Sequence, residues 1–281
     1  MNKLALREKI LQFFQEDVGF GDKTSDAIFT VNDTGTGVFM AKSSGYFCGE
    51  AIIEEAYSTI NPNIQIKMLK KDGQNVLGGE KIAEVSGKMT DLLASERVIL
   101  NLIQRLSGIT TLTREAVNQT IGTKARICDT RKTTPGLRML EKYAVRCGGG
   151  RNHRFALDDA VMIKDNHLAG AGSLTTAVNL VRETHGHMVK IEVEVETLEQ
   201  LKEAIAAEVD VIMLDNCLPE DVAEWVKLIP NNMMVEVSGN ISLNMISKYA
   251  TVGVDVISLG YITHSAPSLD ISFNIVTKDR G

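Results

Sequence analysis

Hydrophobic and polar positions follow two different periods along this chain. In the first third, residues 37–41, 64–69 and 81–85 form short apolar or alternating runs broken by glycine, which is typical of β-strands. Helical patterns cover residues 4–14 and 50–60. Strands grouped with little helix between them predict a small α+β domain.

A longer helical pattern starts near Thr90, with apolar residues recurring at helical spacing. Ser107 and Gly108 interrupt this pattern, and we expect the helix to break there because glycine weakens a helix interior.

From residue 125 onward, short apolar runs alternate with helical patterns. Strands are predicted at 126–129, 160–163, 189–195, 211–214, 233–237 and 254–259, and helices at 137–147, 174–184, 198–207, 219–228 and 243–249. This alternation predicts a parallel sheet with right-handed crossovers. About six units favour a closed but short α/β barrel, and an open doubly wound sheet is the alternative.

Nearly every predicted strand of this second part ends in charged or hydrogen-bonding residues. These ends are 129–132, 164–167, 194–196, 214–216, 236–240 and 258–260. In α/β barrels the reactive groups sit at the carboxyl ends of the strands, so this pattern predicts an active site. Along one strand, Glu192, Glu194 and Glu196 alternate with apolar residues and share one face. We expect these carboxylates to point into the barrel beside cationic partners, unless the strand is an exposed edge.

The charge distribution indicates the kind of ligand. The formal net charge of −6 argues against a general nucleic-acid binder. Residues 131–154 nevertheless hold seven Lys or Arg and one acid, Glu141, which suggests a local anion site or a solvated helix face. The cationic strand ends suit a small polyanion, whereas the acidic ends suit Mg²⁺ or sugar hydroxyls.

Two further features indicate the setting of the protein. No apolar run approaches the length of about 20 residues that a membrane span needs, and the N-terminus has no signal-peptide pattern. The four cysteines lie far apart, without the paired spacing of a zinc site or a redox dithiol. We therefore expect a cytoplasmic enzyme.

Three motifs in order carry a resemblance to a known family. They are Asp-Thr-Arg-Lys-Thr-Thr-Pro-Gly at 129–136, Gly-Gly-Gly-Arg-Asn-His-Arg at 148–154 and Ile-Lys-Asp-Asn-His at 163–167. With them the chain resembles quinolinate phosphoribosyltransferase, the carboxylating nicotinate-nucleotide pyrophosphorylase. The similarity continues at residues 16–22 and 263–267 and so covers nearly the whole chain.

The resemblance implies an N-terminal α/β sandwich domain, residues 1–110, and an open, roughly six-stranded α/β barrel, residues 111–268. The tail, residues 269–281, would return to the first domain. It also implies a homodimer with shared active sites, or a larger assembly of dimers such as a hexamer. The expected reaction joins quinolinate to the phosphoribosyl group of phosphoribosyl pyrophosphate, releases pyrophosphate and CO₂, and serves NAD biosynthesis.

The resemblance also assigns residues to roles. The quinolinate carboxylates would be held by Arg131, His153, Arg154 and Lys164, with Arg97 reaching in from the other subunit. Lys132 would contact substrate or pyrophosphate, Glu194 and Asp215 the ribose hydroxyls and Mg²⁺, directly or through water or substrate, and Ser238, Gly239 and Gly260 the 5'-phosphate. Catalysis would rest on Lys132, Lys164, Glu194 and Asp215.

One residue departs from the family pattern. The family has a second glycine after Ser238-Gly239, where this chain has Asn240. We expect the phosphate loop to survive because Asn tolerates left-handed backbone better than most residues.

Three alternatives stay open. One is a same-fold relative that acts on another base, including the homologue associated with molybdenum transport, which the motifs at 152–154 and 164–167 disfavour. The second is an α/β-barrel aldolase that uses Lys132 or Lys164 as a Schiff-base nucleophile. The third is a non-catalytic sugar-phosphate sensor, which would leave the acidic strand ends unexplained.

Overall fold

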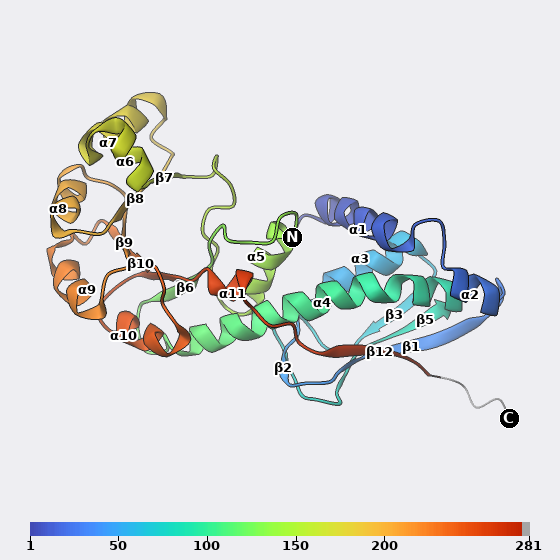
Figure 1. Cartoon of the computed structure of the whole chain (residues 1–281). Helices are drawn as coiled ribbons and strands as arrows, with labels where there is room; N and C mark the ends of the chain where they lie inside the picture. Colours follow the sequence, from blue (N-terminus) through green and yellow to red (C-terminus); the bar gives the residue numbers. More distant parts are fainter. Residues whose placement is uncertain (277–281) are drawn as a thin grey trace. The chain divides into compact units, whose positions relative to one another are not determined.

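The chain forms two compact units in a computed structural model that describes residues 1–276 (Figure 1). The first unit comprises Met1–Leu112, Met139–Gly148 and the segment that begins at Ser265, and the second comprises Thr113–Arg138 and Gly149–His264. Residues 277–281 of the expected C-terminal tail lie outside the described residues. The chain thus crosses between the units more often than one division after residue 110 would require.

The first unit is built on a four-stranded antiparallel sheet in the order β12-β1-β5-β3. Its strands are β1 (Thr34–Ala41), β3 (Gln65–Met68), β5 (Lys81–Lys88) and β12 (Ile271–Val276), and a small ribbon pairs β2 (Gly45–Tyr46) with β4 (Asn75–Val76). Strand β12 comes from the end of the chain and pairs with β1, where Phe39 faces Phe273 with ring centroids 4.7 Å apart. Residues distant in sequence therefore share one core.

Helices cover one face of this sheet, as Figure 1 shows. They are α1 (Lys3–Val18), α3 (Glu50–Ile60) and the first part of α4 (Met89–Asn118); α2 (Lys23–Ile28) and α5 (Arg138–Cys147) complete the unit's helices. Tyr57 of α3 is fully buried against Phe39, with ring centroids 6.4 Å apart. This arrangement is the expected N-terminal α/β sandwich.

The predicted break at Ser107 and Gly108 is wrong, because α4 runs through both residues. The Ser107 hydroxyl accepts the N–H of Cys48 over 2.9 Å. A methyl group on Gly108 would overlap the backbone carbonyl of Pro267. Glycine serves here as the point where two backbones approach closely, and burial of the helix outweighs its poor helix propensity.

The second unit contains a six-stranded parallel sheet in the order β6-β11-β10-β9-β8-β7. Its strands are β6 (Arg126–Cys128), β7 (Val161–Ile163), β8 (Ile191–Val195), β9 (Val211–Asp215), β10 (Met234–Ser238) and β11 (Val256–Ser258). All six strands were predicted. The favoured closed barrel is wrong, however, because β6 and β7 do not pair within the described residues, and the sheet is open as the family resemblance implied.

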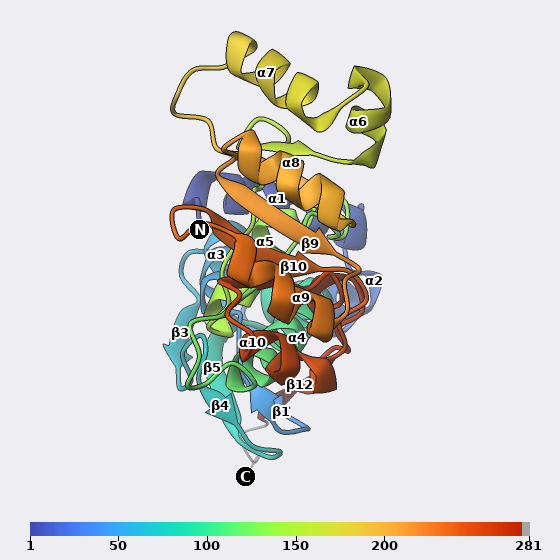
Figure 2. The same cartoon turned by 90° about the vertical axis from the view of Figure 1, so that its left-hand side faces the viewer.

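Helices follow most of the parallel strands and lie on the outer side of the curved sheet (Figures 1 and 2). They are α6 (Asp165–Ala171), α7 (Leu174–Thr184), α8 (Leu198–Ala206), α9 (Pro219–Trp225) with η1 (Val226–Leu228), η2 (Leu243–Met245) with α10 (Ile246–Ala250), and α11 (Tyr261–His264). Among the described residues, no helix has the length and apolarity to cross a membrane.

Register brings the carboxyl ends of the parallel strands to one edge of the sheet. Asp215 at the end of β9 pairs with Ser238 at the end of β10, and Ser258 of β11 pairs with Cys128 of β6. The polar residues that follow the strands therefore gather at one edge.

Candidate active site

A cavity of about 440 Å³ opens at the carboxyl ends of the parallel strands in the second unit. Its lining mixes cations, carboxylates and small polar groups. The lining residues are Thr130, Arg131, Lys132, His153, Arg154, Met162, Lys164, Glu194, Met213, Asp215, Asn216, Glu236, Ser238, Gly239, Asn240 and Ser258.

Two arginines form a cationic wall of this cavity. Nη1 of Arg154 donates to the Ala160 carbonyl over 2.8 Å. Burial, together with the charge of Arg131, lowers the pKa of Arg154. Nε of Arg131 is buried and has no hydrogen-bond partner among the described residues. Two adjacent guanidinium groups, one with an unused buried donor, fit an anionic ligand that bridges them.

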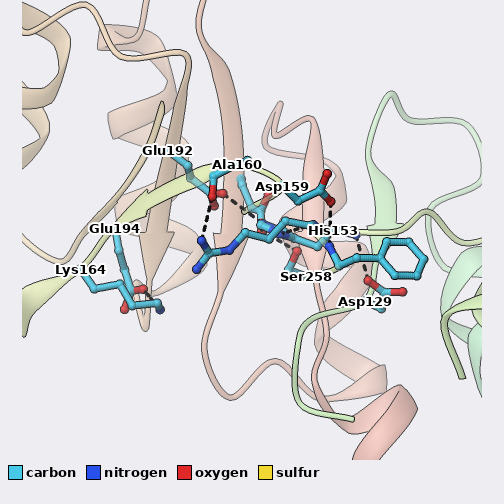
Figure 3. Close-up of polar contacts among 11 residues, drawn as sticks. Asp129, His153, Asp159, Ala160, Lys164, Glu192, Glu194 and Ser258 are labelled. Atoms are coloured by element: carbon cyan, nitrogen blue, oxygen red, sulfur yellow. Dashed lines mark hydrogen bonds and ion pairs between the residues drawn. The ribbon is translucent and has the colours of Figure 1, made fainter. Parts of the chain in front are cut away.

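An acidic pair lies on another wall. Glu194 at the end of β8 forms an ion pair with Lys164, and Figure 3 shows the two side chains facing one another. Burial raises the pKa of Asp215 at the end of β9, and the charge of Glu194 raises it further. Carboxylates that disfavour each other's charge gain from a bound cation.

His153 lies between the strand ends and a preceding loop, with both ring nitrogens engaged (Figure 3). Nδ1 accepts the N–H of Arg154 over 2.8 Å, while Nε2 lies 3.1 Å from Glu192 and 3.5 Å from Glu236. The backbone N–H of His153 donates to Asp129 over 2.8 Å. These contacts join the loop at 151–154 to strands β8 and β10.

The electrostatics of His153 follow from these neighbours. Burial lowers its pKa, but hydrogen bonds to Glu192 and Glu236 outweigh that effect and raise the pKa to about 10. The hydrogen bond from the Arg154 N–H to Nδ1 lowers the pKa of His153, because Nδ1 can accept this bond only while it is unprotonated. Burial raises the pKa of Glu192, and Ser258 donates to Glu236 over 2.5 Å.

The loop after β10 has an unusual backbone. Gly239 has φ of 89° and Asn240 has φ of 50°, so Asn240 adopts the left-handed conformation that asparagine tolerates. A methyl group on Gly239 would lie 2.7 Å from the backbone nitrogen of Asn216, a distance that excludes any side chain there. The loop therefore approaches the end of β9 closely.

A second cavity, of about 400 Å³, shares this loop. It also contains Gly260 and His264, and Lys132 lines both cavities. Thr263 donates its hydroxyl to the Lys132 carbonyl over 2.8 Å. A methyl group on Gly260 would lie 2.9 Å from Cδ of Lys132, so glycine leaves room for the lysine side chain.

Most of the residues assigned from the sequence meet around these two cavities. The first cavity gathers Arg131, Lys132, His153, Arg154, Lys164, Glu194, Asp215, Ser238 and Gly239, and the second adds Gly260. Arg97 lies elsewhere, on α4 of the first unit, with its side chain exposed. Glu196 lies beyond the end of β8 and is also exposed.

Other residues of the site were missed by the sequence analysis. Glu236 is 4% exposed and contacts both Ser258 and His153. Its position two residues before Ser238 places it on the same strand face, a signal that was present in the sequence. Asn216 was noted only as part of a strand end, although its φ of 54° and its side-chain bonds make it part of the loop geometry.

Two family models match this chain. The C-terminal domain of quinolinate phosphoribosyl transferase matches residues 109–274, and the N-terminal domain of the same enzyme matches residues 22–107.

Relatives and solved structures agree with this match. A probable nicotinate-nucleotide pyrophosphorylase (carboxylating) of Bacillus subtilis is 54% identical over 275 residues, which cover 98% of this chain and 95% of the relative. The NadC structure from Streptococcus pyogenes superposes with a TM-score of 0.94 at 37% identity and covers 99% of each chain. The structure of nicotinate-nucleotide pyrophosphorylase from Francisella tularensis gives a TM-score of 0.91 at 36% identity, with 98% of each chain covered.

Proposed function

Because this chain belongs to the quinolinate phosphoribosyltransferase family, we propose that it transfers the phosphoribosyl group of phosphoribosyl pyrophosphate to quinolinate. The products are nicotinate mononucleotide, pyrophosphate and CO₂, which places the enzyme in NAD biosynthesis. One observation carries the assignment to this site: a single cavity combines paired arginines, paired carboxylates and a close-approach glycine loop. These are the groups that a dicarboxylate, a ribose and a phosphate each require.

The cationic wall is the proposed quinolinate site. Arg131 and Arg154 would each bind a carboxylate as a fork, and Lys164 would supply a third positive charge. His153 lies in the same wall, but its ring nitrogens already bind Arg154 and two glutamates. We therefore place His153 as the support that fixes Arg154, rather than as a direct ligand of quinolinate.

The acidic wall is the proposed site for the ribose and for Mg²⁺. Mg²⁺ binds proteins through one or two carboxylates together with substrate phosphates, which matches Glu194 and Asp215. The raised pKa of Asp215 beside Glu194 fits a need for a cation there. When bound, the ion would neutralise charge on the pyrophosphate. Lys132 would contribute a further positive charge to the same leaving group.

The glycine loop is the proposed site for the 5'-phosphate. Ser238 and Gly239 follow β10, and Gly260 follows β11 on the neighbouring strand. Small residues allow backbone N–H groups to approach a phosphate closely, as they do in other phosphate-binding loops.

The reaction follows from these positions. As the bond between C1 and pyrophosphate breaks, positive charge develops on the ribose, and Glu194 and Asp215 stabilise it electrostatically. The pyridine nitrogen of quinolinate then forms the bond to C1. The resulting pyridinium accepts the electron pair left by departure of the 2-carboxylate as CO₂, and a proton replaces that carboxylate at C2. The transfer requires no acid–base dyad.

Arg97 would complete the site of a partner subunit in a homodimer, or in a hexamer built from dimers. This exposed arginine lies on α4 of the first unit, outside the cavity-lining residues. Arg97→Ala and Lys164→Ala variants should each be nearly inactive, while their mixture after subunit exchange should regain about a quarter of wild-type activity. A mixture as inactive as its components would contradict shared sites.

We place the enzyme in the cytoplasm, in keeping with its charged metabolite substrates. Purified protein with phosphoribosyl pyrophosphate, Mg²⁺ and quinolinate should release nicotinate mononucleotide and CO₂. A parallel reaction with nicotinate should give no product, and chelation of Mg²⁺ should stop the quinolinate reaction. Absence of product from quinolinate would refute the assignment.

The ion pair of Lys164 with Glu194 argues against the aldolase alternative. A Schiff-base lysine attacks with a free amine lone pair, which an ion-paired ammonium lacks. Borohydride with a carbonyl substrate should therefore trap no adduct on Lys164 or Lys132.

A further inference from the structure

A short series of hydrogen bonds between side-chain amides joins the ends of strands β9 and β10, and the proposed reaction does not explain it. Nδ2 of Asn240 donates to Oδ1 of Asn216 over 3.1 Å, and Nδ2 of Asn216 donates to Oδ2 of Asp215 over 2.5 Å. The backbone N–H of Asn216 also donates to the carbonyl of Ser238 over 3.0 Å. The phosphate loop is thereby connected to the acidic wall through one side chain.

The orientation of the Asn216 amide is fixed by its two neighbours. If the amide were turned over, its NH₂ would face the NH₂ of Asn240 and its oxygen would face the Asp215 carboxylate. Both contacts would be repulsive, so only the observed orientation satisfies donors and acceptors together. The bond to Asp215 and the bond to Asn240 therefore depend on each other.

The backbone around this series of hydrogen bonds is equally constrained. Asn216, Gly239 and Asn240 all have positive φ, at 54°, 89° and 50°. This conformation is mildly unfavourable for the two Asn residues. Asparagine adopts it more readily than most residues because its side chain can hydrogen-bond to nearby backbone. A glycine at position 240 would adopt the same backbone without strain but would lose the bond to Asn216.

Asn240 lies where the two cavities meet. Asn240 lines both cavities, and Asp215 lines the first of them on one side of the loop. Gly260 and His264 line the second cavity on the other side. A displacement of the loop would therefore change the spacing between the proposed ribose and phosphate sites.

We propose that Asn216 and Asn240 form a positioning pair that holds the 5'-phosphate loop at a fixed distance from Asp215. Phosphoribosyl pyrophosphate is then recognised at its ribose and at its phosphate by one preorganised unit, which lowers the entropy cost of binding. Neither asparagine takes part in bond making. This inference rests on the proposed function for the identity of the ligand.

The test is a kinetic comparison of Asn240→Gly, Asn216→Gly and the double variant, since glycine keeps the positive φ in each case. We expect KM for phosphoribosyl pyrophosphate to rise about tenfold in each single variant, equivalent to about 1.4 kcal/mol. The double variant should also show about a tenfold rise, because the two side chains act as one link. KM for quinolinate should stay within about twofold of wild type.

The matched control is Asn232→Gly, which changes an exposed asparagine just before β10 and outside both cavities. It should leave both KM values unchanged. An unchanged KM for phosphoribosyl pyrophosphate in Asn240→Gly would overturn the proposal. So would an additive, roughly hundredfold rise in the double variant, or equal rises in both KM values.

Binding of inorganic phosphate by calorimetry separates this inference from the proposed function. We expect Asn240→Gly and Asn216→Gly to bind phosphate several-fold more weakly than wild type, with Asn232→Gly unaffected. If wild type makes no mononucleotide, the proposed function fails, while the phosphate comparison still tests the pair. Equal phosphate affinities in all four proteins would refute the positioning role.

Discussion

The imidazole Nε2 of His153 lies 3.1 Å from the carboxylate of Glu192, on a ring whose other nitrogen accepts the N–H of Arg154. The ring thus couples a buried carboxylate to an arginine of the cavity wall. Glu236 approaches the same Nε2 atom at 3.5 Å and receives the hydroxyl of Ser258. Loss of either glutamate should therefore lower the pKa of His153.

A pH dependence of stability follows from this contact. Because the pKa of His153 rises from 6.5 to about 10, its stabilisation is complete below pH 6.5 and is lost as pH rises toward 10. In wild type, the free energy of unfolding should fall as pH rises over this range. Glu236→Gln should make that fall smaller by a few kcal/mol at most, because each unit by which the pKa of His153 decreases corresponds to about 1.4 kcal/mol. Urea unfolding between about pH 6.5 and 9.5 measures the effect.

The exposed His185 provides the control for that experiment. His185→Gln should follow the wild-type pH profile. If Glu236→Gln also followed it, the carboxylate would have no influence on the charge of His153.

Arg131 should contribute directly to quinolinate affinity. Its buried Nε has no partner among the described residues, so a bound carboxylate is the natural acceptor. Arg131→Ala should raise KM for quinolinate about tenfold to hundredfold, the effect of losing hydrogen bonds to a charged group. Arg126→Ala, at the exposed amino end of the same β6 segment, should leave KM unchanged. Near-normal KM and kcat in Arg131→Ala would remove that residue from the site.

Asp72 should stabilise the first unit through three hydrogen bonds. It accepts the N–H groups of Gly49 and Glu50 at the start of α3, over 2.6 and 3.0 Å, and the Tyr143 hydroxyl over 2.6 Å. Asp72→Ala should lower the free energy of unfolding by about 2–3 kcal/mol, since a helix cap and a half-buried hydroxyl both lose their partner. Tyr143→Phe leaves the helix cap intact and should cost about 1 kcal/mol in the same denaturant experiment. Equal losses in the two variants would show that the helix cap contributes nothing.

Two helical glycines should respond oppositely to alanine. A methyl group on Gly108 would overlap Pro267, whereas one on Gly170 of α6 meets nothing within 4 Å. Gly108→Ala should therefore destabilise the protein by about 2 kcal/mol or more through overpacking. Gly170→Ala should be neutral or stabilise it by up to about 1 kcal/mol, because alanine is the better helix former. Thermal unfolding distinguishes the two, and an unaffected Gly108→Ala would mean that the backbones can separate at no cost.

The sequence predicted elements best where local pattern and tertiary burial agree. The run at 50–60 coincides with α3, and the six apolar runs after residue 125 each overlap a parallel strand, with ends that differ by at most two residues. Helices α2 and α6 were missed because both are short, and neither presents a long periodic apolar face. Gly108 misled the prediction because its neighbour Pro267 is distant in sequence.

Site residues could be predicted where they lie at the end of a single predicted strand, as Lys164, Glu194 and Asp215 do. The link between Asn216 and Asn240 was not, because it depends on the register of β9 with β10 and on two positive φ angles. The sequence also could not show whether the barrel is open or closed, because six strands in a row do not specify whether the two edge strands pair.

Helix α5 limits how the coding sequence can be divided between the two units. Nearly all of α5 lies in the segment Met139–Gly148, which belongs to the first unit although segments of the second unit flank it on both sides. Within the first unit Arg105 pairs with Glu141, and Thr110 donates to the Ala144 carbonyl. A gene fragment that starts at residue 111 would encode α5 without these partners, and one that stops at residue 110 would encode the partners without α5. No single cut in the coding sequence therefore separates the two units, and a single crossover cannot exchange one of them intact.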